Sequence, residues 1–465
     1  MRRAGLLLAA GLAGCVAPAT HQSVAPIAPA ALGLSGPRTP AIAPEWWRAF
    51  ADPQLDRIVA DALAGSPDLQ SALARVAQAE AQFAARGAER GPDVTLTGQA
   101  QAARLSGRFT IPPPFAGSVQ LLGTAAANLG YDFDLFGRQR AAIVQAGVVV
   151  DAARLDATAA RLALAGAVVQ TYLDLARAET QAGVARRTIA TRRSALGLVE
   201  AQRRNQLASG VQHSAAETLL AQAEQALTRA QGARSLAVNA LAALAGRGPD
   251  YAAAIVPTTL KPDMALPVPA SVPADLLGRR ADIVAARARV EAAEAGRQVA
   301  RRAFLPNINL GALVGLQAVG LGNFLTLDAG TIGVGPALSL PLFDNGRNKA
   351  ALAGAVAGVD AAIAEYNGRV VAAAREAADA LAQIANVQAQ AREQEAVLVG
   401  LRRTARLNQV RVGAGLDSKL GLVDTDVRLL EAEQARADLS TAAAQARVQL
   451  VLALGGGFTP QDIRP

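Results

Sequence analysis

Two long stretches without proline constrain the fold of this 465-residue chain most strongly. No proline occurs at residues 115–248 or at residues 342–459. Because proline breaks the interior of a helix, each stretch can hold helices far longer than those of ordinary globular domains. Glycines near the two ends of each stretch correspond at one constant offset, which relates Gly137 to Gly346 and Gly246 to Gly455. The sequence therefore predicts an internal duplication.

A pair of segments with period-two alternation precedes each proline-free stretch. Apolar residues alternate with polar or small ones at residues 94–102, 119–135, 308–316 and 332–342. This period is typical of strands with one apolar face, and about ten residues let a tilted strand cross a bilayer. A transmembrane helix over residues 308–343 is the alternative, but seven glycines and two prolines in that segment argue against it. We expect two β-hairpins, at about residues 92–135 and 307–343.

Four strands cannot close a barrel by themselves. An open sheet edge in lipid would leave backbone groups without hydrogen-bond partners, at a cost of several kcal/mol each. Known single-chain barrels begin at about eight strands. The chain is therefore expected to share a barrel, and two, three or four copies would supply eight, twelve or sixteen strands.

The proline-free stretches predict the length of the helices. Residues 138–208 and 346–412 can each form one helix, and the second, with 67 residues, would be about 100 Å long at ~1.5 Å per residue. Ser209 with Gly210, and Gly413 with Gly415, would break these helices. In each half the chain is then expected to run back in the opposite direction as two helical segments. These segments are residues 215–245 and 274–303 in the first half, and residues 416–454 and 53–90 in the second.

The last return segment carries a coiled-coil pattern. Eleven positions alternate in spacings of four and three, and nine of them are apolar: Leu416, Leu420, Val423, Val427, Leu430, Gln434, Ala437, Thr441, Ala444, Val448 and Val451. A heptad pattern of this kind predicts that the helix packs along its length against neighbouring helices.

The N-terminus reads as a secretory signal followed by a lipid-attachment cysteine. Arg2 and Arg3 precede an apolar run that is too short to span a bilayer, and Leu12-Ala13-Gly14-Cys15 resembles the lipobox of bacterial lipoproteins. We expect cleavage before Cys15 and a covalent lipid on its thiol. Residue 16 is Val rather than the Asp associated with inner-membrane retention in that family, which favours the outer membrane.

These features divide the chain into six expected segments. They are a signal peptide at residues 1–14, a lipid-anchored linker at 15–52, a first repeat at 53–247, a Pro-rich connection at 248–273, a second repeat at 274–455 and a tail at 456–465. Trp46 and Trp47, in the linker, are expected to pack the N-terminal segment against the helices.

Composition argues against several other classes of function. The formal net charge is +8, but the arginines are scattered among acidic and amide residues, with no basic block interleaved with aromatics, so no nucleic-acid partner is expected. One cysteine and two histidines offer no cluster for a metal or for thiol chemistry. No group of residues has the spacing of an active site, and we expect neither enzymatic activity nor a cofactor other than the lipid.

Four separated segments resemble the outer membrane factor family, the TolC-like exit ducts. They read EWWRAFADP at residues 45–53, YDFDLFGR at 131–138, PADLLGRRADI at 273–283 and ALGGG at 453–457. The resemblance is strongest to the lipidated NodT-type branch, which serves tripartite efflux systems, and it covers essentially the whole mature chain.

This resemblance implies a mixed α/β membrane protein that is mainly α. The family forms a homotrimer, in which four strands per chain make a 12-stranded barrel in the outer-membrane lipid and long coiled-coil helices make a periplasmic α-barrel. A periplasmic adaptor (membrane fusion protein) and an inner-membrane transporter of the resistance-nodulation-division type would complete the pump. The duct itself would conduct small molecules passively.

The resemblance also implies the functional residues. Leu420-Gly421-Leu422-Val423-Asp424 is similar to the family segment that supplies an aspartate and a leucine to the periplasmic aperture, which assigns Asp424 and Leu420 to that role. Asp417 lies one heptad before Asp424 and is expected on the same helix face. The family places an arginine three residues after the aspartate, whereas this chain has Val427 followed by Arg428, so the ion-pair partner of Asp424 stays open.

The tips of the helical hairpins are the expected adaptor-docking sites, formed by Gly210, Val211, Gly413 and Gly415. Two other functions remain alternatives at this point. An outer-membrane duct for type I protein secretion shares the fold, but the lipobox and the PADLLGRR segment favour small-molecule efflux. A periplasmic adaptor would show one helical hairpin rather than two and would lack strands of membrane length.

Overall fold

The computed structural model describes residues 23–28, 31, 42–108, 112–260 and 277–459. The chain divides into two compact units. One unit comprises Met1–Pro26, Arg75–Ala153 and Ala286–Tyr366, and the other comprises Ile27–Ala74, Arg154–Ala285 and Asn367–Pro465. The predicted signal peptide and Cys15 lie outside the described residues.

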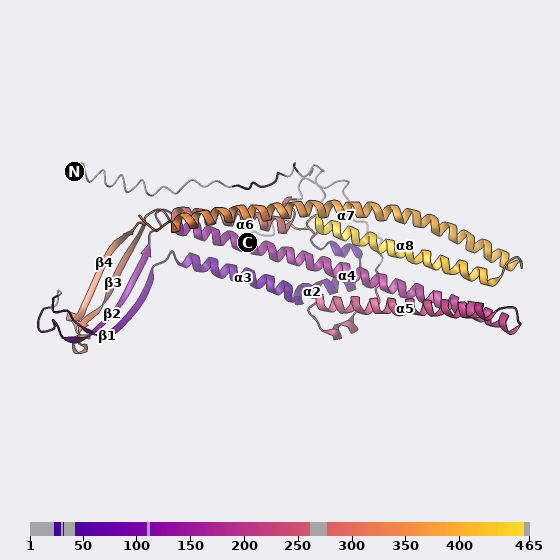
Figure 1. Cartoon of the computed structure of the whole chain (residues 1–465), viewed down its shortest axis with the longest axis horizontal. Helices are drawn as coiled ribbons and strands as arrows, with labels where there is room; N and C mark the ends of the chain where they lie inside the picture. The colour runs from indigo at the N-terminus through magenta and orange to yellow at the C-terminus, as the bar shows by residue number, and fades with distance from the viewer. Residues whose placement is uncertain (1–22, 29–30, 32–41, 109–111, 261–276, 460–465) are drawn as a thin grey trace. The chain divides into compact units, whose positions relative to one another are not determined.

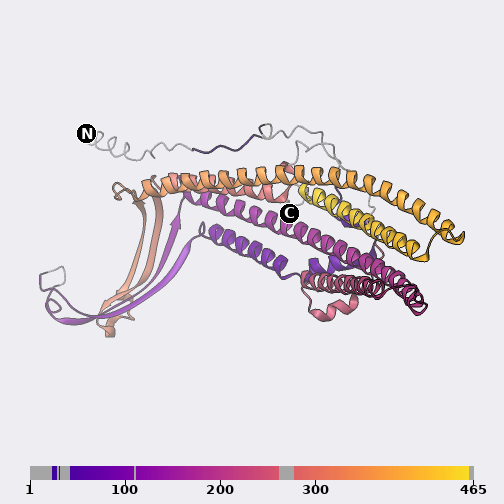
Figure 2. The ribbon, with the colours of Figure 1, turned by 45° about the vertical axis from the view of Figure 1, so that its right-hand side comes forward.

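The first unit contains one antiparallel sheet of four strands. These are β1 (Asp93–Arg104), β2 (Val119–Asp132), β3 (Asn307–Val319) and β4 (Gly330–Ser339), and they lie side by side in the order β1-β2-β3-β4 (Figures 1 and 2). The register pairs Thr97 with Ala126, Ala126 with Gly315, and Gly315 with Thr331. Gly315 passes so close to β2 that a Cβ atom there would lie 2.6 Å from the Cα of Ala126.

Two strands end earlier than the alternation predicts. Strand β2 ends at Asp132 instead of residue 135, because Asp134 turns the chain with φ of 45° and caps the next helix by accepting from the backbone N–H groups of Gln139 and Arg140, both at 2.9 Å. Strand β4 ends at Ser339 instead of residue 342. Pro341 follows, and a proline cannot donate to the ladder of a strand.

Both edges of the sheet are open within one chain. Strands β1 and β4 each pair with one neighbour only among the described strands. Large apolar side chains on these two strands are also exposed: Val94, Leu96, Ile332, Val334 and Leu338. Exposed apolar side chains are unfavourable in water, and unpaired backbone N–H and C=O groups are unfavourable in lipid. The two edge strands therefore require further strands as partners.

The helices repeat at the same offset as the glycine pairs. Helices α4 (Arg138–Arg204) and α7 (Arg347–Gly413) have 67 residues each, and α5 (Gly210–Leu244) and α8 (Lys419–Ala453) have 35 each. All four boundaries of α4 and α5 recur at this offset in α7 and α8, as from Arg138 to Arg347. Each 67-residue helix is about 100 Å long at ~1.5 Å per residue.

The return segments differ from the prediction at their ends. The segment expected at residues 53–90 is interrupted, because α2 (Pro53–Gly65) and α3 (Pro67–Ala88) meet at Ser66, whose ψ of 123° is extended as expected for a residue before proline. Helix α6 (Ala281–Arg302) replaces the segment expected at 274–303. Helix α4 ends at Arg204 rather than 208, because Gln206 adopts a left-handed φ of 61°.

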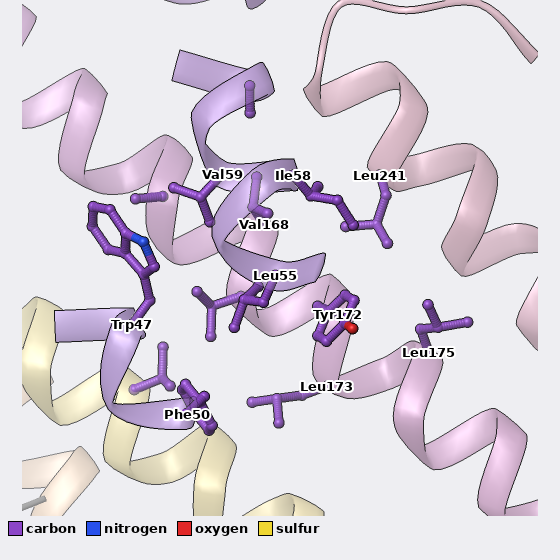
Figure 3. Packing of buried hydrophobic residues seen from close by; sticks show 14 of the residues in the cluster. Trp47, Phe50, Leu55, Ile58, Val59, Val168, Tyr172, Leu173, Leu175 and Leu241 are labelled. Atoms are coloured by element: carbon purple, nitrogen blue, oxygen red, sulfur yellow. The ribbon is translucent and has the colours of Figure 1, made fainter. Parts of the chain in front are cut away.

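The core of the second unit joins the N-terminal segment to three helices. The 3-10 helix η2 (Trp46–Phe50) contributes buried Trp47 and Phe50, and α2 contributes Leu55, Ile58 and Val59 (Figure 3). They pack against Tyr172 and Val168 of α4, Leu241 of α5 and Val448 of α8. The coiled-coil pattern of α8 is half-buried at three positions, Leu430, Gln434 and Ala437, and buried at Val427, Thr441, Ala444, Val448 and Val451. Leu416 precedes the helix and is exposed.

A buried hydrogen-bond cluster centres on Asp52 in this core. Its carboxylate accepts from the backbone N–H groups of Gln54 at 2.9 Å and Leu55 at 3.3 Å, and so caps α2. It also accepts from the hydroxyl groups of Tyr172 at 2.9 Å and Thr258 at 3.3 Å. The side-chain amide of Gln54 donates to the Tyr172 hydroxyl at 3.0 Å. These contacts tie the N-terminal segment to α4 and to the chain that follows α5.

Two glycine junctions repeat in the second unit. Gly246, after α5, has φ of 66° and packs on the carbonyl oxygen of Gly65, while Gly455, after α8, has φ of 104° and packs on the carbonyl oxygen of Arg279. A Cβ atom at either glycine would overlap the carbonyl oxygen. Arg280, next to the second junction, forms ion pairs with Asp282 at 2.8 Å and Glu376 at 2.7 Å.

No helix in the described ranges combines the length and apolar character needed to cross a bilayer.

Candidate functional site

The ends of the helical hairpins repeat like the helices themselves. Gln206 and Gly415 occupy equivalent positions, and both are left-handed, with φ of 61° and 71°. Leu207 and Leu416 follow, and their backbone N–H groups donate to the carbonyls of Gln202 at 2.8 Å and Arg411 at 2.9 Å, as in the Schellman helix ending. Ser209 and Ser418 then cap α5 and α8.

The predicted tip residues do not all lie in the turns. Gly210 and Val211 belong to the first turn of α5, and Gly413 is the last residue of α7, so only Gly415 of the four lies in a turn. Ser209, rather than Gly210, is the last residue of the turn between α4 and α5, because its hydroxyl caps α5. Val211 is 80% exposed, and Leu207 and Leu416 are 77% and 72% exposed.

Sequence reasoning did not assign Leu207 or Leu416 to the tips. The sequence does relate the two leucines to each other, because they are separated by the same number of residues as the members of each glycine pair. Large apolar residues are thus exposed at equivalent points of both hairpins.

Asp417 and Asp424 lie in different structural settings. Asp424 is on α8 and pairs with Arg428, one turn further on, at 3.0 Å, with both side chains more than half exposed. Asp417 precedes the cap residue Ser418, so it is not on a helix face with Asp424 as the heptad spacing predicts. Its carboxylate instead contacts Arg411 at 3.4 Å and accepts from the backbone N–H of Ser418 at 2.7 Å.

Leu420 and Asp424 line a groove of about 240 Å³ between α8 and the α4–α5 hairpin. Arg192 and Val199 of α4, Leu219 of α5 and Val423 of α8 also line it. The groove thus brings residues of both hairpins together near their ends.

Each hairpin is held together separately near its end. Arg193 of α4 pairs with Glu224 of α5 at 3.0 Å. Asn408 of α7 donates to the hydroxyl of Thr425 of α8 at 2.8 Å. These contacts join the two helices of each hairpin near the tip.

The N-terminal segment contacts α7 at two points. Asp360 accepts from the Ser23 hydroxyl at 2.6 Å and from the backbone N–H of Val24 at 3.2 Å. Asn367 accepts from the backbone N–H of Ile27 at 2.9 Å. Hydrogen bonds from Ser23 hold the pKa of Asp360 below its usual value. The chain at residues 23–27 is thus fixed along α7.

The described residues contain no group of three or more His, Cys, Asp or Glu side chains placed to hold a metal ion. His213, at the start of α5, lies 3.3 Å from Glu217 and 3.9 Å from Glu200. The contact with Glu200 joins α5 to α4 near their ends.

The geometry of the strands and hairpins agrees with comparisons to known proteins. The family model described as outer membrane efflux protein matches residues 58–247 and 272–456. The chain therefore belongs to the outer membrane efflux protein family. It is an outer-membrane exit duct for efflux, as its relatives and structural neighbours are.

Individual relatives resemble the chain over different lengths. The outer membrane protein OprJ of Pseudomonas aeruginosa is 32% identical over 97% of this chain and 95% of its own. The fusaric acid resistance protein FusA of Burkholderia cepacia is 37% identical over 68% of this chain, which spans 60% of FusA. The crystal structure of VceC from Vibrio cholerae matches with a TM-score of 0.81 and 33% identity over 89% of this chain and 99% of VceC.

Proposed function

We propose that this duct is a homotrimer that serves as the outer-membrane subunit of a tripartite efflux pump. The open edges of the four-stranded sheet are the observation that carries this proposal, because β1 and β4 need partners in lipid. Three copies would give twelve strands. A periplasmic adaptor and an inner-membrane transporter would supply the substrate and the energy, and the duct would conduct passively without catalysis.

The proposed cargo is small toxic organic molecules. FusA is named for resistance to fusaric acid, and its match covers most of this chain. A strain without this duct is expected to become sensitive to a subset of antibiotics, dyes and organic acids, and the wild-type gene should restore resistance. Unchanged resistance together with loss of an exported protein would instead favour type I secretion. Native mass spectrometry in detergent should show three chains.

Cys15 is the proposed site of lipid attachment. The lipobox supports this, and a chain with two lipid anchors would stay at the membrane before its strands insert. Intact-mass spectrometry should find a chain that begins at a lipid-modified Cys15. Cys15→Ser should reduce the amount of duct in the outer membrane without abolishing assembly. An intact Met1 or a free Cys15 thiol would contradict the assignment.

Asp424, with Leu420 one turn away, is the proposed aperture of the trimer. Three copies of Asp424 around one axis would form an acidic ring that attracts cations and repels itself unless arginines compensate. Asp417 lies in the adjoining turn and would add to the same acidic collar. Asp424→Ala should lower cation selectivity and raise channel opening in planar bilayers. If both stay at wild-type values, Asp424 is an ordinary flanking charge.

The hairpin ends are the proposed docking surface for the adaptor. Gly210, Val211, Gly413 and Gly415 belong to it, and the exposed Leu207 and Leu416 extend it. Two similar ends per chain would offer the adaptor two similar positions on every subunit.

A further inference from the structure

A cavity of about 740 Å³ lies near the junction of α8 and α6 in the second unit. Residues of α4, α7, α8 and the start of α6 line it, and eight of these seventeen residues are alanine or glycine. Small residues at so many positions leave a hollow where larger side chains would fill the space between the helices. The volume lies within the range of about 300–1,000 Å³ that is typical of pockets for small organic ligands.

The ionised side chains of the cavity sum to a negative charge. Three carboxylates and one guanidinium line it, which gives a formal charge of −2. The guanidinium of Arg280 is engaged with Asp282 at 2.8 Å and with Glu376 at 2.7 Å. Asp379 pairs instead with Arg375 at 3.2 Å, and both of these side chains are exposed. Because the side chain of Glu376 is also partly exposed, the carboxylates of Asp379 and Glu376 are accessible to a cationic group from solvent.

The remaining lining is apolar or neutral. Leu162 of α4 and Leu452 of α8 supply apolar surface together with the alanines. Gln383, Gln445 and Gln449 supply side-chain amides. An apolar surface with a few polar groups and an excess of carboxylates fits a molecule with an apolar body and one positive charge. The same lining disfavours organic anions, because like charges repel.

The cavity and the 3-10 helix η2 lie on different sides of α8. Ala444 belongs to the core cluster that contains Trp47 of η2. Ala442 and Ala446, which line the cavity, are each two residues from Ala444 and therefore about 200° around the helix from it. The packing of η2 on α8 thus leaves this side of the helix uncovered.

Gln445 relates the cavity to the proposed aperture. It occupies the heptad position of Asp424, three heptads further along α8, so both residues lie on one face of this helix. With Asp424 at the aperture, as proposed, this face borders the lumen of the duct. The cavity then lies in the wall along which the cargo passes.

We propose that this cavity binds organic cations with an apolar body as they pass through the duct. The carboxylates of Asp379 and Glu376 attract the cationic group, and the leucines and alanines contact the apolar body. Both carboxylates are partly exposed, so the attraction is weak in water. Weak binding suits a duct, because its cargo must leave each site as well as enter it. This inference rests on the proposed efflux of small organic molecules and on the proposed aperture, and it names one class of cargo.

The test is equilibrium binding of the cationic dye ethidium to the purified full-length duct in phosphatidylcholine nanodiscs, with empty nanodiscs as the reference. Fluorescence anisotropy should show saturable binding that weakens as the salt concentration rises. Asp379→Asn should raise the dissociation constant by about two- to fivefold, the range expected for one partly exposed charge contact. Glu393→Gln removes the same charge from an exposed position of α7, two heptads further on and outside the lining, and should not change it. The anionic dye fluorescein should bind more weakly than ethidium.

A second measurement locates the bound dye. Gln449 is an exposed lining residue, and Cys15, the single cysteine of the chain, is the proposed site of lipid attachment. Maleimide should therefore label Gln449→Cys selectively, and saturating ethidium should slow this labelling. Ala221→Cys, at an exposed position of α5 outside the lining, should be labelled at an unchanged rate. Ala163→Phe, which places a ring at an exposed lining position of α4, should abolish saturable binding.

The outcomes separate this inference from the proposed function. Unchanged binding in Asp379→Asn, or labelling of Gln449→Cys that ethidium does not slow, overturns the assignment of the cavity. Equal binding of ethidium and fluorescein overturns the preference for cations. Both results leave the efflux function in place, because the resistance of a strain without the duct tests that function separately. Binding at the cavity together with unchanged resistance of that strain would contradict the efflux function instead.

Discussion

Gly455→Ala is expected to prevent assembly of the duct. Gly455 has φ of 104°, and a Cβ atom there would overlap the carbonyl oxygen of Arg279. The left-handed backbone alone costs a non-glycine residue about 1–2 kcal/mol, and the overlap forces α6 away from the end of α8. We expect a loss of roughly 3 kcal/mol or more, which is the range of severe single substitutions. The amount of protein in isolated outer membranes measures the effect.

Gly197→Ala is the matched control. Gly197 lies inside α4, and among the described residues an added Cβ atom would meet nothing within 4 Å beyond the adjoining backbone of its own helix. Alanine is a better helix former than glycine by about 0.5–1 kcal/mol, so this variant should assemble at least as well as wild type. Normal assembly of Gly455→Ala would show that the junction can rearrange and that the close packing is not essential.

Asp52→Ala is expected to release the N-terminal segment from the helices. Asp52 is 4% exposed, and the alanine removes the cap of α2 and the acceptor of two hydroxyl groups. A lost cap costs about 1 kcal/mol, and buried groups left without partners cost about 1–3 kcal/mol. Burial raises the pKa of Tyr172 to about 12, so its hydroxyl still donates at neutral pH and would have lost its carboxylate acceptor.

Two further variants serve as comparisons for Asp52→Ala. Asp52→Asn keeps the cap and should lose about half as much stability, whereas Glu45→Ala removes only an exposed pair with Arg48 and should be close to neutral. Hydrogen exchange of α2 and η2 in the purified duct provides the measurement. Because the pKa of Tyr172 is raised, wild-type stability should also decline as the pH rises from 10 toward 12. Unchanged protection of α2 in Asp52→Ala would contradict the anchoring role.

The sequence predicted the large elements well because their signals are long. Proline-free stretches and the constant offset between the two repeats define α4 and α7 to within a few residues at each end. Alternation over ten or more residues likewise located all four strands. Errors occurred where one local contact decides the boundary, as at Asp134, which ends β2 by capping α4, and at Ser418, whose cap leaves Asp417 outside α8.

Long-range partners could not be read from the sequence. The segment at residues 273–283 marked the family, but nothing in it indicates that Arg280 pairs with Glu376, 96 residues away. Burial would raise the pKa of Asp282, yet the hydrogen bonds from Arg280 hold it below its usual value.

The two helical hairpins of each chain have equal helix lengths. Because α4 and α7 have 67 residues each and α5 and α8 have 35 each, both hairpins of a chain end at matching points of their helices. Removal of one heptad from α4 alone would withdraw one hairpin by about 10 Å relative to the other and misalign its seam. The length of the helical hairpins can therefore change without loss of this match only if both halves of the chain change together.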